Sequence, residues 1–220
     1  MLTISPLEKY AWFNFKGTFA VTHTSFDGLD LGGKNVELMT RGKYHVAGGL
    51  TSPDDHACVR LMYRTTIANK LTYGKLYALE GFLVGAKQHE MPFLLIDVDG
   101  KREVPNTFAF QETRIESLGL VEGCIDPEIN PEPQRMLSVI VKHDGIDEND
   151  PHDGAMVVEY VIPRNLFSGR ATEVFTAGRR VLFRGTLAGW NRDRDMVRVK
   201  VSGGTLDRGN GKTPHLKARD

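Results

Sequence analysis

The stretch Gly178-Arg-Arg-Val-Leu-Phe-Arg-Gly185 indicates the fold most directly. Between its glycines the side chains alternate, with Val181 and Phe183 on one side and Leu182 and Arg184 on the other. A period of two residues is typical of a β-strand. The leading glycine fits a turn, and the second glycine fits a bulge or a sharp bend. We therefore expect a curled strand of the kind that a small barrel needs in order to close.

The same spacing occurs in two other stretches. Gly42-Lys43 precedes Gly49, and Gly74-Lys75 precedes Gly81, with alternating or apolar residues between the glycines. Further strand candidates are Trp12–Phe19, Asn35–Met39, Val59–Thr65, Phe93–Val98, Thr107–Phe110, Met136–Lys142, Ala155–Ile162 and Met196–Val201. Because short turns separate these strands and helical periodicity is weak, the sequence predicts a mainly β protein. The architecture we expect is an antiparallel barrel or a sandwich.

Short helices and one hairpin complete the local predictions. The helical candidates are Arg114–Leu120 and Pro163–Gly169, the second because a proline suits the first turn of a helix. Asp99-Gly100 follows an apolar run that ends at Val98. Since this dipeptide supplies the positive φ angles of a tight turn, it favours a hairpin there.

A proline-rich segment suggests how the chain is divided. Pro127, Pro131 and Pro133 fall within seven positions, which disfavours both a helix interior and a central strand. We therefore expect an N-terminal β domain at 1–120 and a proline-rich acidic linker or crossing at 121–133. A C-terminal β unit with a basic hairpin would follow at 134–205, and a mobile tail at 206–220. A single large sheet domain is the alternative.

Charge is distributed unevenly although the formal net charge is zero. Residues 111–160 hold 3 basic and 12 acidic side chains, whereas residues 161–220 hold 13 basic and 5 acidic ones. This asymmetry suggests an electrostatic role for one segment, or a pairing between the two segments within or between chains.

The compartment that the sequence predicts is intracellular, either cytoplasm or nucleus. Cys58 and Cys124 are the only cysteines, and neither has the spacing of a disulfide framework or a zinc site. No basic segment followed by an apolar stretch begins the chain, and no long uncharged apolar run occurs. We therefore expect no membrane partner.

No motif predicts a cofactor or a catalytic centre. Gly209-Asn-Gly-Lys-Thr213 ends like a phosphate-binding loop, but Leu206 stands where that pattern requires glycine. A Gly-x-Ser-x-Gly elbow is absent, and neither cysteine has an activating context. We expect no cofactor and a non-enzymatic protein. The alternative left open is a metal-dependent hydrolase that uses Asp97, Asp99 or the acidic loop at 143–154.

The segment Gly178–Lys200 is predicted to form a hairpin, which we call the C-terminal hairpin, and its residues indicate a binding function most strongly. Arg198 and Lys200 share one face of a predicted strand, and the valines between them share the other, so the apolar face would pack on the core. Cations beside a tryptophan are suited to single-stranded nucleic acid, because cations neutralise phosphates and the aromatic ring stacks on bases. The candidate binding residues are Arg179, Arg180, Arg184, Trp190, Arg192, Arg194, Arg198 and Lys200.

These glycine-framed strands and the basic hairpin resemble the strands of oligonucleotide-binding (OB) barrels. The resemblance is one of fold, over about a third of the chain, and fold does not determine function. We therefore expect two small barrel-like or sandwich-like units, with one or two short helices. The first functional hypothesis is single-stranded DNA or RNA binding through the basic face. The second is a protein-interaction or self-assembling module in which acidic and basic segments meet.

Overall fold

The computed structural model describes most of the chain. The described residues are 13–27, 36–46, 56–66, 69–84, 93–96, 100–105, 111–125, 136–143, 155–166, 170–191, 193–206 and 215–216. Among them, no helix combines the length and the apolar character that crossing a membrane requires. The strands are β1 (Phe13–Val21), β2 (Phe26–Asp27), β3 (Val36–His45), β4 (His56–Thr65), β5 (Leu76–Val84), β6 (Phe93–Ile96), β7 (Arg102–Val104), β8 (Arg114–Ile125), β9 (Met136–His143), β10 (Met156–Pro163), β11 (Arg180–Asn191), β12 (Met196–Leu206) and β13 (His215–Leu216).

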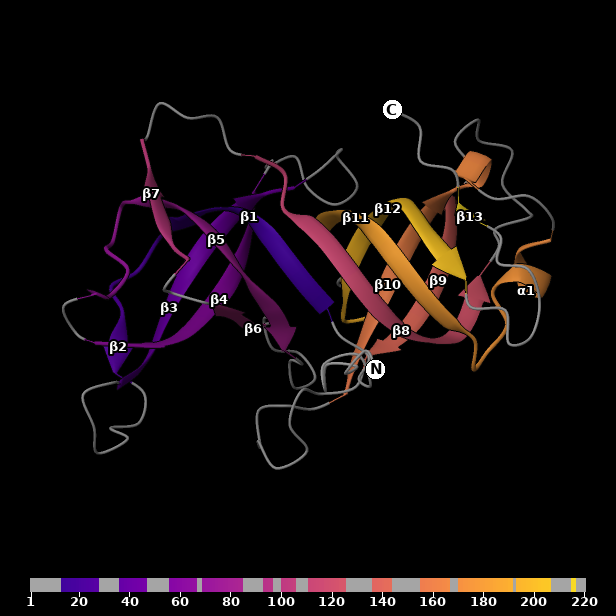
Figure 1. Ribbon diagram of the computed structural model, residues 1–220, viewed down its shortest axis with the longest axis horizontal. Helices are drawn as coiled ribbons and strands as arrows, with labels where there is room; N and C mark the ends of the chain where they lie inside the picture. Colours follow the sequence, from indigo (N-terminus) through magenta and orange to yellow (C-terminus); the bar gives the residue numbers. More distant parts are fainter. Residues whose placement is uncertain are drawn as a thin grey trace, which may run out of the picture.

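Two closed barrels of five strands each make up the molecule (Figure 1). In the first barrel, neighbouring strands follow the order β1-β3-β4-β6-β5 and return to β1. In the second barrel the order is β8-β9-β10-β12-β11 and back to β8. Numbered within each barrel, both orders are 1-2-3-5-4, and in both the third and fifth strands are parallel while the other pairs are antiparallel.

A five-stranded barrel of this kind is the OB architecture. The prediction of mainly β, barrel-like units is therefore confirmed, and the described strands form barrels rather than a sandwich. The helices are short: a 3-10 turn at Arg164–Leu166, and α1 at Ala171–Val174 between the third and fourth strands of the second barrel. The first of these falls inside the predicted helical segment Pro163–Gly169.

The fourth strand of each barrel is one of the glycine-framed stretches. Gly74 and Gly178 precede β5 and β11 with φ angles of 78° and 80°, so each leading glycine makes a turn that other residues rarely adopt. An added Cβ atom would lie 2.0 Å from the Leu95 carbonyl oxygen at Gly81, and 2.2 Å from the Lys200 carbonyl oxygen at Gly185. The second glycine therefore permits a close approach of the neighbouring strand.

The third stretch differs, because Gly42 lies inside β3 rather than at a turn. Residues 47–50, which include its second glycine, lie outside the described residues. The predicted strand at Thr107–Phe110 also lies outside them.

Strand β8 corrects one predicted helix. Arg114–Leu120 alternates between more exposed and buried side chains, with Ile115 and Ser117 facing inward, which is the period of a half-buried strand. Because β8 continues to Ile125, it crosses the predicted limit at 120, and the second barrel begins at Arg114. Residues 126–133 of the predicted linker lie outside the described residues.

The predicted hairpin at Asp99-Gly100 is not formed among the described strands. Strand β7 follows this dipeptide but pairs with β5, because β6 already has β4 and β5 as its neighbours. In the segment predicted to be a tail, His215–Leu216 forms β13 and pairs with β12.

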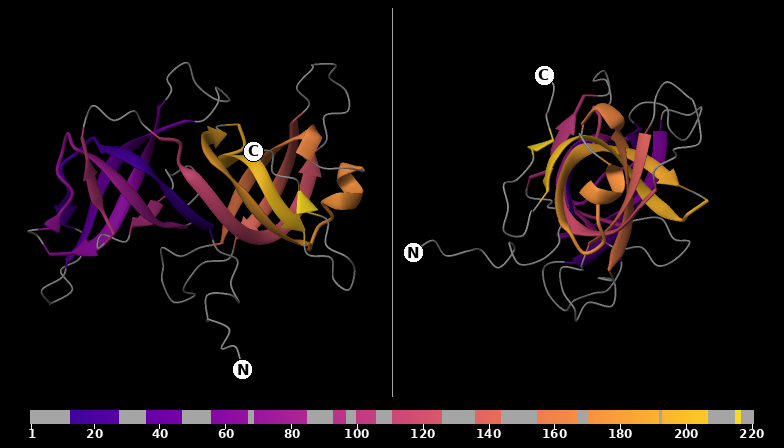
Figure 2. Two further views of the ribbon diagram at one scale, coloured as in Figure 1. Left: turned by 45° about the horizontal axis from the view of Figure 1, so that its top comes forward. Right: turned by 90° about the vertical axis from the view of Figure 1, so that its right-hand side faces the viewer.

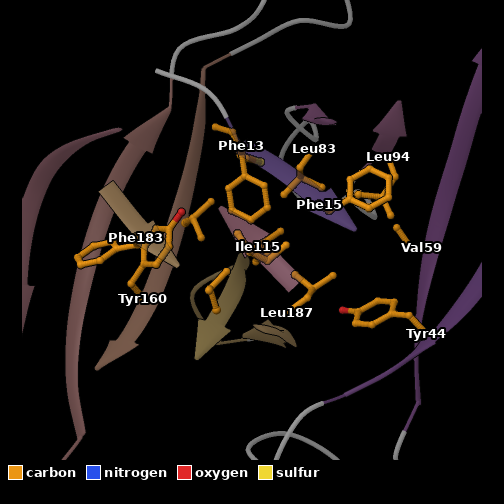
Figure 3. Packing of buried hydrophobic residues seen from close by; sticks show 14 of the residues in the cluster. Phe13, Phe15, Tyr44, Val59, Leu83, Leu94, Ile115, Tyr160, Phe183 and Leu187 are labelled. Carbon is orange, nitrogen blue, oxygen red and sulfur yellow. The ribbon is translucent and has the colours of Figure 1, made fainter. Parts of the chain in front are cut away.

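The barrels are joined edge to edge through β1 and β8. Phe13–Lys16 pairs antiparallel with Arg114–Ser117, so one hydrogen-bonded sheet runs from the first barrel into the second, and the barrels lie one behind the other along the long axis (Figure 2). One hydrophobic cluster extends through both (Figure 3). In it, Phe13 and Ile115 lie between Tyr44 and Leu94 of the first barrel and Tyr160 and Phe183 of the second.

Candidate nucleic-acid interface

The C-terminal hairpin has the two-faced design that its sequence predicts. Val197, Val199 and Val201 are buried in the core of the second barrel, whereas Arg198 and Lys200 between them are partly exposed on its outer surface. On β11, Thr186 lies opposite Lys200, and the exposed Arg184 precedes Thr186 by two positions on the same face.

A buried glutamate binds two of the predicted arginines. Glu159 on β10 has a side chain that is only 5% exposed, and its carboxylate lies 2.8 Å from Arg198 Nε and 3.4 Å from Arg194 Nη1. Ser138 Oγ and Asn191 Nδ2 also donate hydrogen bonds to it, each at 2.7 Å. Burial pushes the pKa of the Glu159 carboxyl up, but the donors Ser138, Asn191 and Arg198 outweigh burial and lower the pKa below its ordinary value.

Arg194 and Arg198 therefore have a structural role. They neutralise a buried carboxylate, and Asn191 and Arg194 lie at the end of the hairpin between β11 and β12. Because an unpaired buried charge is costly, these contacts hold the hairpin end against β10.

The remaining predicted residues have separate environments. Arg179 Nη1 donates a 2.6 Å hydrogen bond to the Val174 carbonyl at the end of α1. Trp190 is partly buried against the core after a bulge at Gly189, whose φ is 93°. Arg180 is exposed at the start of β11, and Arg192 lies outside the described residues. Among the predicted residues that the structure describes, Arg180, Arg184 and Lys200 have exposed or partly exposed side chains on the outer surface of the second barrel.

A second basic surface lies on the first barrel, and the sequence analysis missed it. Arg41 and Lys43 are exposed on β3, and Arg60 on β4 lies opposite Arg41. The Arg60 guanidinium carbon is 3.6 Å from the centroid of the Phe93 ring, a cation–π contact that holds the guanidinium flat. We call Arg41, Lys43, Arg60 and Phe93 the N-terminal basic face.

This face is the outer side of the second and third strands of the first barrel. Among the described outward side chains of β3 and β4, Glu37 is the only acidic one. The sequence contains one local indication of this face, Arg41-Gly-Lys43. Its two cations are two positions apart and therefore lie on the same side of a strand, as the cations of the C-terminal hairpin do. The pairing that places Arg60 beside Arg41 could not be predicted from a local sequence pattern, because ten residues separate β3 from β4.

The equivalent face of the second barrel is different in character. Strands β9 and β10 direct Ile140, Val157 and Val161 outward around Glu159, and Lys142 is the cation of β9. The two barrels therefore share a topology but do not present the same binding chemistry.

A groove of about 740 Å³ lies where the two barrels join. Strands β1 and β5 of the first barrel and β8, β11 and β12 of the second line it. Its charged lining residues are Lys16, Arg114, Arg184, Glu80, Glu112 and Glu116. Two ion pairs lie in it, Lys16–Glu80 and Arg184–Glu116, each with an N–O distance of 2.7 Å.

The hydrolase alternative depends on residues that are largely undescribed. Asp97, Asp99 and residues 144–154 lie outside the described residues. His143 is described, and it is buried in the second barrel, where its Nδ1 lies 2.9 Å from the Leu118 carbonyl and its Nε2 2.9 Å from the Tyr160 hydroxyl. No group of three or more potential metal-ligating side chains occurs within the described part of the chain.

Comparisons with known proteins identify similar structures but no relatives in sequence. No protein-family model matches the chain, and no curated protein sequence matches it. A crystal structure of a deletion mutant of the single-stranded DNA binding protein from Thermus aquaticus aligns with a TM-score of 0.60 and 16% identity, over 94% of this chain and 98% of that one. The wild-type protein aligns with a TM-score of 0.57 and 14% identity, over 92% and 97%. At these identities the likeness establishes the fold.

Proposed function

We propose that this protein binds single-stranded DNA and that the N-terminal basic face makes the main contact. The observation that carries the proposal is the cluster of Arg41, Lys43 and Arg60 on the outer side of β3 and β4. The second and third strands are the surface that OB barrels use to bind oligonucleotides. Exposed Arg41 and Lys43 can neutralise phosphates, and the flat guanidinium of Arg60 can stack on a base.

The C-terminal hairpin contributes a second set of cations in this proposal. Arg180, Arg184 and Lys200 lie on the outer surface of the second barrel. The likeness to single-stranded DNA binding proteins extends over both barrels, which supports contacts from both.

A charge-neutral variant of the N-terminal basic face tests the proposal. We expect Arg41→Gln/Lys43→Gln/Arg60→Gln to weaken binding of a fluorescein-labelled thymidine oligonucleotide, measured by anisotropy across a salt series. Because each lost phosphate contact on a single strand reduces the salt slope by about 0.7, loss of the Arg41 and Lys43 contacts reduces it by about 1.4. Lys75→Gln is the matched control, since Lys75 pairs with Glu103 on another surface. Equal affinity and equal slope for the triple variant and the wild type would exclude this face.

A further inference from the structure

The groove between the barrels is lined by Arg184 of the C-terminal hairpin, and strand pairing connects it to β4 of the first barrel. Paired residues in neighbouring strands point to the same side of a sheet. Starting from β4, Met62 lies opposite Leu95 of β6, and Leu95 lies opposite Phe82 of β5. Phe82 lies opposite Asn14, Asn14 opposite Glu116, and Glu116 opposite Arg184, and the last two belong to the second barrel. Phe82 and Arg184 both line the groove.

A second row of paired residues crosses the junction beside the first. Glu80 lies opposite Lys16, Lys16 opposite Arg114, and Arg114 opposite Thr186, which is itself opposite Lys200. The sheet therefore joins the surface beside the N-terminal basic face to the C-terminal hairpin through a lined groove.

The groove contains an aromatic side chain and an exposed cation. Phe82 is partly exposed on the outer face of β5, where its ring can stack on a base. Arg114 is exposed, and no hydrogen bond or ion pair engages its side chain among the described residues. A phosphate bound to Arg114 would therefore displace no partner among the described residues.

The other two cations are held by carboxylates that a phosphate can replace. The side chains of Lys16 and Glu80 are 76% and 47% exposed, and those of Arg184 and Glu116 are 65% and 43% exposed. Solvent-exposed ion pairs contribute little to stability, so Lys16 and Arg184 can exchange them for phosphates. Glu80 and Glu116 would then oppose binding by repelling the DNA backbone.

From this arrangement, and resting on the proposed function, we infer that one DNA strand passes through the groove from the first barrel to the second. Phe82 stacks on a base at the junction, Arg114, Lys16 and Arg184 contact phosphates, and Glu80 and Glu116 weaken the interaction. The protein then holds one long strand as a single continuous site, rather than two short strands on independent barrels.

Oligonucleotide length separates the groove from the individual barrels. A thymidine oligomer of about 8 nucleotides lies within the range that one OB barrel covers, whereas one of about 25 exceeds it. We expect Phe82→Ala and Arg114→Gln each to weaken binding of the longer oligomer about tenfold and to leave binding of the shorter one unchanged. Phe82→Leu, which keeps an apolar side chain against the barrel, should show the same loss if stacking is the cause.

Removing the resident carboxylates should have the opposite effect. Glu80→Gln/Glu116→Gln is expected to tighten binding of the longer oligomer several-fold at low salt, and the gain should disappear at high salt. Glu103→Gln is the control, since Glu103 pairs with Lys75 away from the groove.

The outcomes distinguish the inference from the proposed function. If the wild type binds both oligomers and none of the groove variants changes binding of the longer one, the inference is wrong and the proposed function stands. If the wild type binds neither oligomer, the proposed function itself fails. Loss of affinity for both lengths in a groove variant that melts at the wild-type temperature would also overturn the single-path inference, because the groove would then serve the short site.

Discussion

At the scale of single residues, Glu159 is the clearest case in which a structural role and a predicted binding role compete. Four side chains donate hydrogen bonds to its buried carboxylate. We expect Glu159→Gln to lower the free energy of unfolding by about 2 kcal/mol at neutral pH, since hydrogen bonds to charged groups contribute about 1.5–3 kcal/mol. Urea denaturation at a series of pH values measures this loss.

The pH dependence of that effect follows from the lowered pKa of Glu159. A carboxyl whose pKa is lower in the folded state stabilises the protein above its unfolded-state pKa of about 4.3, and this stabilisation is lost as pH falls through the folded-state pKa. The difference between wild type and Glu159→Gln should therefore shrink in acid. A difference that is constant between neutral and acidic pH would contradict this assignment.

Thr113 at the barrel junction offers a stabilising substitution. Its side chain is fully buried, and its Oγ1 has no hydrogen-bond partner among the described residues. Because a buried hydroxyl without a partner costs about 1–3 kcal/mol, Thr113→Val should raise the melting temperature by a few degrees. Differential scanning calorimetry tests this, and a lower melting temperature would show that the hydroxyl has a role in the junction.

At the scale of elements, the glycine-framed strands β5 and β11 explain how each barrel closes. We expect Gly81→Ala and Gly185→Ala each to destabilise the protein by about 3 kcal/mol, because the new methyl group would overlap a carbonyl of the adjacent strand. Gly123→Ala is the matched control, since no atom lies within 4 Å of an added Cβ there. If all three variants melted alike, the close approach of the strands would not matter for closure.

Local patterns predicted most strands but not their partners. Alternation identified β9, β10 and β12, and the glycine spacing identified β5 and β11, because both signals lie within about ten residues. The helix predicted at Arg114–Leu120 is wrong, because burial on one side of β8 depends on its pairing with β9 and β11. The candidate site could be predicted only in part for the same reason. Arg184 and Lys200 were predicted because they lie in one hairpin. Arg60, Phe82 and Arg114 could not be predicted, because their place in the site depends on pairings between distant strands.

At the scale of the whole molecule, the acidic middle and the basic end of the chain meet within one protein. Glu116 pairs with Arg184, and Glu159 with Arg194 and Arg198. These ion pairs neutralise some charges of the acidic segment with charges of the basic segment, inside the second barrel and at the junction. The cations of the N-terminal basic face belong to neither segment, so the charge asymmetry did not indicate the face that we propose for binding.

The two barrels should behave as one unit during unfolding, because β1 pairs with β8 and one hydrophobic cluster extends through both. We expect a single calorimetric transition. Phe15→Ala, at the junction, should lower its midpoint without splitting it, and cost about 3–5 kcal/mol. Two separate transitions in the wild type would show that the barrels unfold independently.

The central claim is that the molecule binds single-stranded DNA through exposed cations and stacking side chains. An equilibrium titration of a labelled thymidine oligonucleotide of about 25 nucleotides, with unlabelled single-stranded and duplex competitors at two or more salt concentrations, tests it most directly. We predict that affinity falls steeply as salt rises and that the single strand competes far better than the duplex. Absence of binding at low salt, or equal competition by duplex DNA, would contradict the claim.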